Sequence, residues 1–130
     1  MATTLTNTHA QRYGDEGPTI TPNRLGLVYE AAIEKNENGK VNIHKVNYKV
    51  DGINVSAHVY TPAGYTSRGR YAAVVVAHPN GGSKEQVAGL YAQRLAEAGF
   101  VAIAFDARYQ GESGGEPRRT DKPANRIGDI

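Results

Sequence analysis

Residues 71–106 constrain the fold most, because they read as a strand, a glycine-rich turn, a helix and a second strand. Residues 72–77 are an unbroken apolar run, which is typical of a parallel strand covered on both faces. Ser83 followed by Gln86 is a capping box, so the helix is predicted to begin at Ser83 with its first N–H groups facing the turn 78–82. Gly99 predicts a left-handed helix end, and residues 101–105 predict a second parallel strand. Together the four parts predict one βαβ unit.

The predicted helix is amphipathic, with Glu85, Gln93 and Glu97 on its polar side. The face predicted to pack on the sheet consists of Val87, Ala88, Tyr91, Ala92, Leu95 and Ala98. A right-handed crossover brings the carboxyl ends of both strands to one edge of the sheet, so His78 and Asp106 are expected there together. Open α/β sheets bind ligands at this edge, and function should therefore be sought there.

An antiparallel hairpin is predicted before the βαβ unit. Apolar residues alternate over residues 41–50 with one slip in register, and they alternate strictly over residues 53–59. Asp51-Gly52 between them is a type I′ turn signal. Residues 25–33 could form a short helix or a strand packed on the core. We divide the chain into a partly irregular N-terminal arm, residues 1–40, and a partial α/β core, residues 41–130, with mostly parallel strands.

Composition excludes several classes of function. Fifteen basic against 13 acidic side chains give a net charge of +2, too small and scattered to indicate nucleic acid or an anionic membrane. The longest apolar run is six residues, far below the roughly 20 that cross a bilayer. The chain has no cysteine, which suits a reducing compartment. With no secretory signal in the first ten residues, we expect a cytoplasmic protein.

One full-length helix is too little to cover a mostly parallel sheet, which needs helices on both faces. Residues 126–130 look like the opening of another helix, and five residues do not hold a helix by themselves. The strand at residues 72–77 would then show a face, and an edge, to water. We therefore expect the front half of a larger fold, completed by its remainder or by another chain, with a homo-oligomer as one form.

Two stretches carry a resemblance to a known family. VNYKVDGINVSAHVYTPAG forms the hairpin, and VVVAHPNGGSKEQVAGLYAQRLAEAGFVAIAFDARYQGESGGEPR contains an HPxGG turn, an SKEQ cap and a DxRxxGES loop in the same order. Over residues 41–130 the chain resembles the N-terminal half of bacterial α/β-hydrolases of the dienelactone-hydrolase-like group. The resemblance implies a small-molecule ester or thioester substrate, no cofactor, and a twisted eight-stranded sheet of which the first four strands are present. The family's nucleophile, acid and histidine come later than these residues.

The turn after the first parallel strand is the strongest candidate site. In the family this turn usually gives a backbone N–H to the oxyanion formed during acyl transfer. Pro79 has no N–H, so we expect Asn80 to donate, with Gly81 in support. The alternative is a tight turn whose glycines serve only backbone geometry. His78 is expected to be a hydrogen-bonded core histidine more than a base.

Residues 111–115, Gly-Glu-Ser-Gly-Gly, match G-x-S-x-G in text only. That motif needs a strand running into the serine and a helix leaving it, whereas here the strand ends at Phe105 and Glu116-Pro117 follow. We therefore do not expect Ser113 to be the nucleophile, and we rank a triad of Ser113, His78 and Asp106 low.

The remaining loop residues are expected to shape the pocket. Asp106 and Arg108 are predicted to pair and to hold the loop in place, with Tyr109 and Gln110 at the pocket mouth. The basic cluster at Arg118, Arg119 and Lys122 is expected to be a solvated face and not an anion site. His9, His44 and His58 lack metal-ligand spacing, and no metal site is expected.

Two rival functions come from other classes. Strand, glycine turn, helix and a terminal acid also describe a nucleotide-binding module, but HPNGGS lacks both G-x-G-x-x-G and the Walker pattern. A non-catalytic scaffold that completes its sheet with a partner chain is the other alternative.

Overall fold

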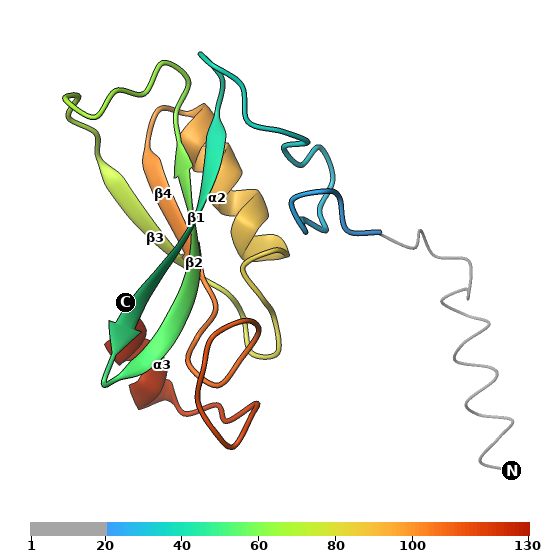
Figure 1. The fold of residues 1–130 in the computed structure, drawn as a ribbon, viewed down its shortest axis with the longest axis vertical. Helices are drawn as coiled ribbons and strands as arrows, with labels where there is room; N and C mark the ends of the chain where they lie inside the picture. The colour runs from blue at the N-terminus through green and yellow to red at the C-terminus, as the bar shows by residue number, and fades with distance from the viewer. Residues whose placement is uncertain (1–20) are drawn as a thin grey trace, which may run out of the picture.

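The computed structural model describes residues 21–130, and the first half of the predicted arm lies outside the described residues. Four strands form one mixed sheet in the order β1-β2-β4-β3 (Figure 1). In chain order the elements are β1 (Asn42–Val50), β2 (Ile53–Thr61), β3 (Ala73–Ala77), α2 (Val87–Glu97), β4 (Val101–Phe105) and α3 (Pro123–Asp129). The predicted hairpin followed by a βαβ unit is confirmed.

The hairpin of β1 and β2 turns at the predicted dipeptide. Asp51 has a φ of 49° and Gly52 a φ of 78°, which is the type I′ signature. The slip in the apolar alternation is not a break in strand pairing, because the pairing runs without a break from Asn42↔Thr61 to Val50↔Ile53. Instead the apolar pattern changes face. Ile43 packs in the cluster beneath α2, and Val46 and Val50 pack in a second cluster on the opposite face.

Strand β3 is the edge of the sheet and pairs only with β4, in parallel. It was expected to be covered on both faces if the sheet were complete, but its residues alternate between exposed and half-buried, and Val75 is 43% exposed. The open face and edge that a single long helix predicts are therefore present in residues 21–130. Ala77 pairs with Phe105, so β3 and β4 end together at one edge, as expected.

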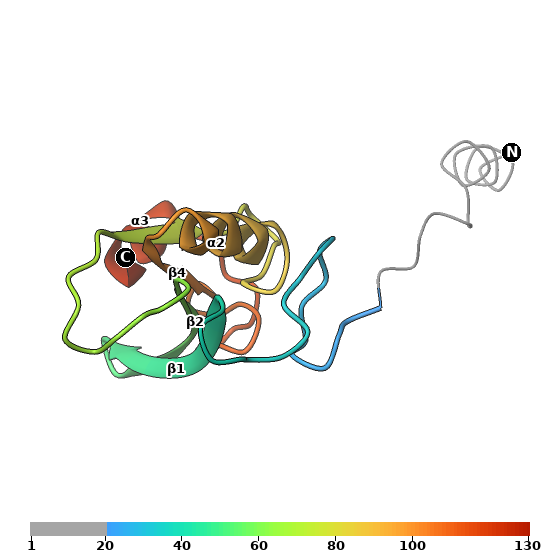
Figure 2. The same ribbon diagram turned by 90° about the horizontal axis from the view of Figure 1, so that it is seen from above.

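Helix α2 lies over one face of the sheet (Figure 2). It begins at Val87, not at Ser83, although the Ser83 N–H does bond to Gln86 Oε1 at 3.1 Å. Its end is as predicted, since Gly99 has a φ of 100° and donates to the Ala96 carbonyl.

The predicted inner face of α2 is wrong in part. Tyr91 is 62% exposed and Val87 41% exposed, whereas the buried residues are Ala88, Gly89, Ala92, Gln93 and Ala96. Small residues on this face let the helix approach the sheet closely. A Cβ on Gly89 would meet the Lys84 carbonyl oxygen at 2.5 Å and the Tyr60 hydroxyl at 3.0 Å. Close packing of the helix on its neighbours, and not the hydrophobicity of its side chains, therefore decides which face of α2 is buried.

Residues 21–41 contain neither of the elements considered for residues 25–33, because no helix or strand forms there. The segment is nevertheless fixed to α2. The Val28 N–H donates to the Glu85 carbonyl, and Leu27, 2% exposed, belongs to the core beneath the helix. The Gln93 side chain accepts from Ile33 N at 3.0 Å and donates to Ala31 O at 2.8 Å.

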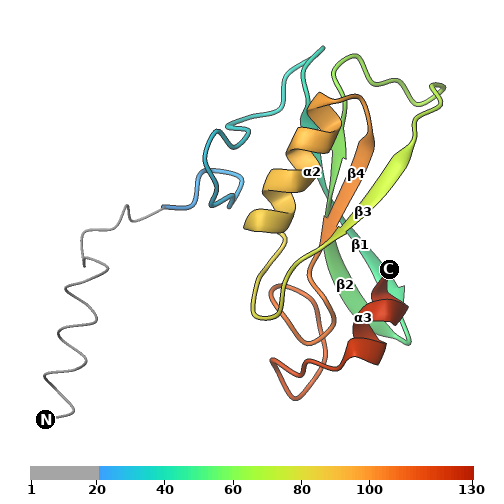
Figure 3. The ribbon, with the colours of Figure 1, turned by 180° about the vertical axis from the view of Figure 1, so that it is seen from behind.

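Helix α3 lies beside the β1–β2 turn, at the end of the sheet where β3 and β4 finish (Figure 3). The predicted helix over residues 126–130 is thus present but begins earlier, at Pro123, which suits a first helical position. The Tyr48 hydroxyl donates to the Asp129 carbonyl at 2.8 Å, and this bond joins α3 to β1. No helix of residues 21–130 is long and apolar enough to span a bilayer.

Candidate functional site

The turn between β3 and α2 contains N–H groups that are bonded within the protein and others that are not. Gly82 N donates to the Pro79 carbonyl at 2.9 Å, while Gly81 has a φ of 74°. Further along, Lys84 N donates to Asp106 Oδ1 at 2.8 Å. The Asn80 and Gly81 N–H groups bond to nothing within residues 21–130. Both residues proposed from the sequence therefore keep an N–H that is not bonded within the described part of the chain.

His78, directly after β3, is 3% exposed, and both its ring nitrogens are engaged. The Ala107 N–H donates to Nε2 at 3.0 Å. Since Nε2 accepts, the ring proton is on Nδ1, which donates to the Pro79 carbonyl at 2.7 Å. The ring thus ties the turn after β3 to the loop after β4, and neither nitrogen is free to take a proton from a substrate.

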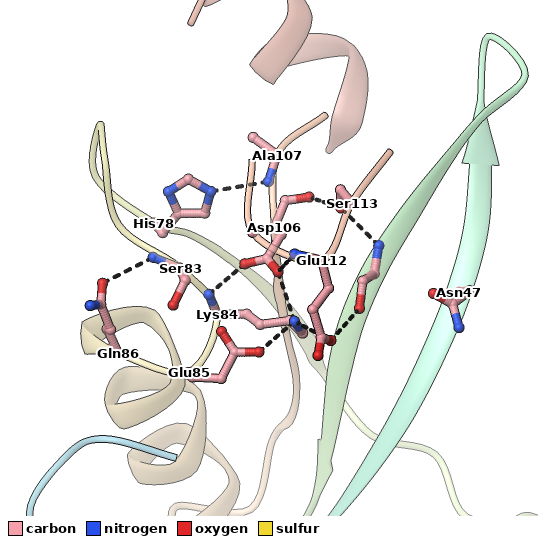
Figure 4. Close-up of polar contacts among 12 residues, drawn as sticks. Asn47, His78, Ser83, Lys84, Glu85, Gln86, Asp106, Ala107, Glu112 and Ser113 are labelled. Atoms are coloured by element: carbon pink, nitrogen blue, oxygen red, sulfur yellow. Dashed lines mark hydrogen bonds and ion pairs between the residues drawn. The ribbon is translucent and has the colours of Figure 1, made fainter. Parts of the chain in front are cut away.

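Lys84 is the centre of a buried charge cluster that sequence reasoning missed (Figure 4). Its Nζ lies 2.7 Å from Asp106 Oδ2, 2.5 Å from Glu85 Oε1 and 2.9 Å from Glu112 Oε2. Asp106 also accepts from Glu112 N at 2.9 Å. The cluster fastens the turn before α2 to the loop after β4. Lys84 and Glu85 lie in the SKEQ cap and Asp106 and Glu112 in the DxRxxGES loop, but neither motif shows that the two pair, because the partners lie as far as 28 residues apart.

The charge state of the cluster follows from its hydrogen bonds. Burial by itself lowers the pKa of the Lys84 ammonium, but bonds to Asp106, Glu85 and Glu112 outweigh it, and the net pKa is raised. The hydrogen bond to Lys84, aided by its charge, lowers the pKa of the Glu112 carboxyl. Lys84 is therefore an ammonium at neutral pH and not a base.

Oxygens of the same three carboxylates lie within 4.8 Å of one another, a spacing that could hold a metal ion. The Lys84 ammonium bonds to all three, so a protein cation already takes the position between them. The arrangement fits a structural charge cluster.

The predicted Asp106–Arg108 pair is wrong. Asp106 pairs with Lys84, whereas the Arg108 side chain points toward the β1–β2 turn and α3. Arg108 Nε lies 2.5 Å from Asp129 Oδ1, and its Nη1 lies 2.6 Å from Asp51 Oδ2. In an extended strand residues 106 and 108 would lie on one side, but β4 ends at Phe105 and the chain turns over residues 108–110, so the two side chains separate. Arg108 thereby joins α3 to the β1–β2 turn.

Ser113 is 2% exposed, and its hydroxyl is occupied on both sides. It donates to the Asp106 carbonyl at 2.6 Å and accepts from the Ser56 N–H at 2.9 Å. Residues 111–115 lie in a loop with neither a strand before nor a helix after them. Among residues 21–130, no histidine ring bonds to this hydroxyl.

A cleft of about 720 Å³ opens beside the two free donors. It is lined by residues 80–82 of the turn, residues 109–111 of the loop, and Arg118 and Arg119. Tyr109 and Gln110, expected at a pocket mouth, are thus among its walls. Tyr109 has a φ of 73°, an uncommon backbone conformation for a bulky residue.

His58 on β2 is a second buried group that the sequence did not single out. It is 0% exposed, and neither ring nitrogen has a partner in residues 21–130. Burial, aided by the positive charge of Lys84, lowers the pKa of His58 to about 4. The ring is therefore neutral at pH 7.

Comparisons with known proteins identify the fold. No family model matches the chain. It is 55% identical over 78 residues to the uncharacterized protein YcjY of Escherichia coli (strain K12), covering 60% of this chain and 26% of that protein. The crystal structure of hypothetical protein PA2218 from Pseudomonas aeruginosa matches with a TM-score of 0.64 and 42% identity, covering 71% of this chain and 29% of that one.

The α/β hydrolase GrgF from Penicillium sp. sh18 matches with a TM-score of 0.60 and 21% identity, covering 68% of this chain and 29% of that one. The chain spans about a quarter of the length of the curated relatives it matches. Its sheet and helices therefore have the fold of the N-terminal part of an α/β-hydrolase, as the sequence predicts.

Proposed function

We propose that this chain is the N-terminal part of an α/β-hydrolase that cleaves an ester or thioester of a small molecule through an acyl-enzyme. Its own contribution is an oxyanion-binding turn and one wall of the substrate pocket. The nucleophile is a hydroxyl or thiol outside these 130 residues, and the dienelactone-hydrolase-like group is the subgroup we favour from the sequence.

The observation that carries the proposal is the pair of free N–H groups at Asn80 and Gly81, beside a cleft at the carboxyl edge of the sheet. When a nucleophile attacks a carbonyl carbon, the C=O electron pair moves to oxygen, and fixed donors stabilise that negative charge. The donors are already aimed before the reaction, because His78 and Lys84 bind the turn to the loop after β4. The pocket wall is residues 109–111.

Ser113 has no part in the chemistry we propose. Its hydroxyl proton bonds to the Asp106 carbonyl, and a nucleophile needs a base to remove that proton. The chain alone should therefore hydrolyse p-nitrophenyl acetate no faster than its Ser113→Ala variant.

A chimera provides the direct test. Residues 21–118 of this chain replace the matching part of the Pseudomonas aeruginosa protein, and chimera and parent are compared in hydrolysis of p-nitrophenyl acetate. Both are then treated with paraoxon, which leaves a tetrahedral phosphoryl group on a serine nucleophile. We expect hydrolysis by both proteins and its loss on phosphorylation.

Amide NMR of the phosphorylated chimera tests the donors themselves. The Asn80 and Gly81 amide protons should move downfield on forming hydrogen bonds to the phosphoryl oxygen, while Gly82, whose N–H is bonded to Pro79, serves as the internal control. Unmoved Asn80 and Gly81 resonances in a phosphorylated chimera would contradict the donor assignment. Absence of hydrolysis and of phosphorylation in both proteins would contradict the hydrolase proposal.

A further inference from the structure

The cleft beside Asn80 and Gly81 carries positive charge and no negative charge. Arg118 and Arg119 are the charged residues that line it, and the other lining residues are uncharged. Neither arginine forms an ion pair with any carboxylate of residues 21–130. The expected solvated basic face is thus, at two of its three positions, part of the cleft wall.

Arg118 is held in place by neutral groups. Its Nη1 donates to the Ser113 carbonyl at 2.5 Å and the Gly115 carbonyl at 3.2 Å, and its Nη2 donates to the Gly111 carbonyl at 2.8 Å. Carbonyl oxygens orient a guanidinium without cancelling its charge. Glu116 is the closest acid in the chain, but its carboxylate accepts from the Arg118 backbone N–H and does not line the cleft.

Arg119 is placed by an unusual backbone contact. Its N–H donates to the Tyr109 carbonyl at 2.7 Å, and both residues lie in the left-handed region, with φ of 63° and 73°. Non-glycine residues take this conformation rarely, and such positions concentrate at binding sites. The Arg119 guanidinium itself makes no hydrogen bond within the described part of the chain.

Two acids close to the cleft already pair with a lysine. Asp106 and Glu112 lie next to the loop that lines the cleft, and both bond to the Lys84 ammonium. The free N–H groups of Asn80 and Gly81 add partial positive charge on the facing wall. The charged side chains of the cleft and these two N–H groups therefore all suit an anion.

We propose that this cleft binds an oxyanion group of the substrate, a carboxylate or a phosphate, with Arg119 as its main contact and Arg118 in support. The inference deepens the proposed function and rests on it for the identity of the ligand as substrate. It selects esters with a charged acyl or leaving group over neutral ones, because guanidinium binds such groups by charge-assisted hydrogen bonds.

Binding by the chain itself is the test. ¹⁵N-labelled protein is titrated with monomethyl glutarate and with dimethyl glutarate, which differ in one negative charge. We expect the Asn80, Gly81 and Arg119 amides to shift with the monoester, and its affinity to exceed that of the diester about tenfold or more. Raising NaCl from about 0.05 to about 0.5 M should weaken binding of the monoester and leave binding of the diester unchanged. Methyl phosphate, as a third probe, tells which oxyanion is preferred.

Arg119→Asn removes the charge, and asparagine tolerates the left-handed backbone. This substitution should lower the affinity for monomethyl glutarate about five- to tenfold and leave the affinity for dimethyl glutarate unchanged. Arg70→Gln, in the loop at the other end of β3, is the matched control and should change neither. For Arg118→Gln the affinity is measured together with an amide NMR spectrum that reports whether the loop keeps its conformation, because the Arg118 side chain also bonds to loop carbonyls.

Equal affinity for monoester and diester, no amide shift at the cleft, or an Arg119→Asn variant that binds like the parent would each overturn the anion site. The outcome is separable from the proposed function. A chimera that hydrolyses p-nitrophenyl acetate while the chain fails to select the monoester would leave the hydrolase and remove the anion preference. Selection of the monoester by the chain, without hydrolysis by the chimera, would support the anion site and contradict the hydrolase proposal.

Discussion

Lys84 Nζ lies 2.7 Å from Asp106 Oδ2, and both side chains are fully buried. One residue comes from the turn before α2 and the other follows β4, so their contact fixes the two walls of the cleft relative to each other. A buried ion pair adds little stability compared with an apolar pair of the same shape, but losing one partner is costly. The pair therefore contributes more to the geometry of the cleft than to the free energy of unfolding.

Lys84→Met should lower the free energy of unfolding by about 3–5 kcal/mol, because Asp106 is left as a buried charge without a positive counter-charge. Urea denaturation measures it. Lys35→Met is the control, since the Lys35–Glu37 pair has side chains 74% and 50% exposed, and it should cost less than about 1 kcal/mol. Equal losses in the two variants would mean that the buried cluster contributes nothing special.

His58 should make the protein acid-sensitive. Its folded pKa is about 4, against about 6.5 when unfolded. The unfolded chain thus binds the extra proton first, and stability is lost as pH falls from about 6.5 to about 4, by about 3 kcal/mol in total. His58→Leu should remove that part of the pH dependence and His44→Gln should retain it, as measured by unfolding free energy at a series of pH values. Parallel curves for His58→Leu and the parent protein would refute the assignment.

Ser113→Ala should destabilise the chain by about 2–3 kcal/mol, because it strands the Ser56 N–H and the Asp106 carbonyl in a buried site. Ser67→Ala, in the exposed loop before β3, should cost less than about 0.5 kcal/mol. Hydrolysis of p-nitrophenyl acetate should be the same before and after the Ser113 change. A wild-type excess that this substitution abolishes would make Ser113 a nucleophile.

Gly111→Ala should be far worse than Gly64→Ala. Both glycines have positive φ, 52° and 71°, but a Cβ on Gly111 would collide with the Asp106 carboxylate, whereas Gly64 has nothing within 4 Å. The Gly64 variant therefore measures backbone strain alone, about 1–2 kcal/mol. The Gly111 variant adds overpacking of about 1–3 kcal/mol. Thermal unfolding of both variants compares them, and matching losses would rule out the contact with Asp106.

The local parts of this fold could be predicted because each depends on a few neighbouring residues. Asp51-Gly52 sets the hairpin through its positive φ angles, and Gly99 ends α2 for the same reason. The inner face of α2 could not be predicted from hydrophobicity. Gly89 allows close contact with Tyr60, so the helix turns Tyr91 outward.

Only the backbone groups of the candidate site could be predicted from the sequence. Asn80 and Gly81 follow from chain order, since Pro79 lacks an N–H and a turn must follow β3. The partners of Asp106 do not follow from order. Arg108 is near Asp106 in sequence and Lys84 is 22 residues away, yet the path of the folded chain brings Lys84 to the carboxylate. The arginines of the cleft are likewise brought there by a loop without regular structure.

The contacts of Gln93 and Leu27 determine where this unit can be cut. A version starting at Val41 would keep every strand and helix found in residues 21–130, yet it would uncover the core beneath α2 and leave the Gln93 amide without Ala31 and Ile33. Any exchange of modules with a relative should therefore carry residues 21–40 along, because the transferable piece is larger than its regular secondary structure.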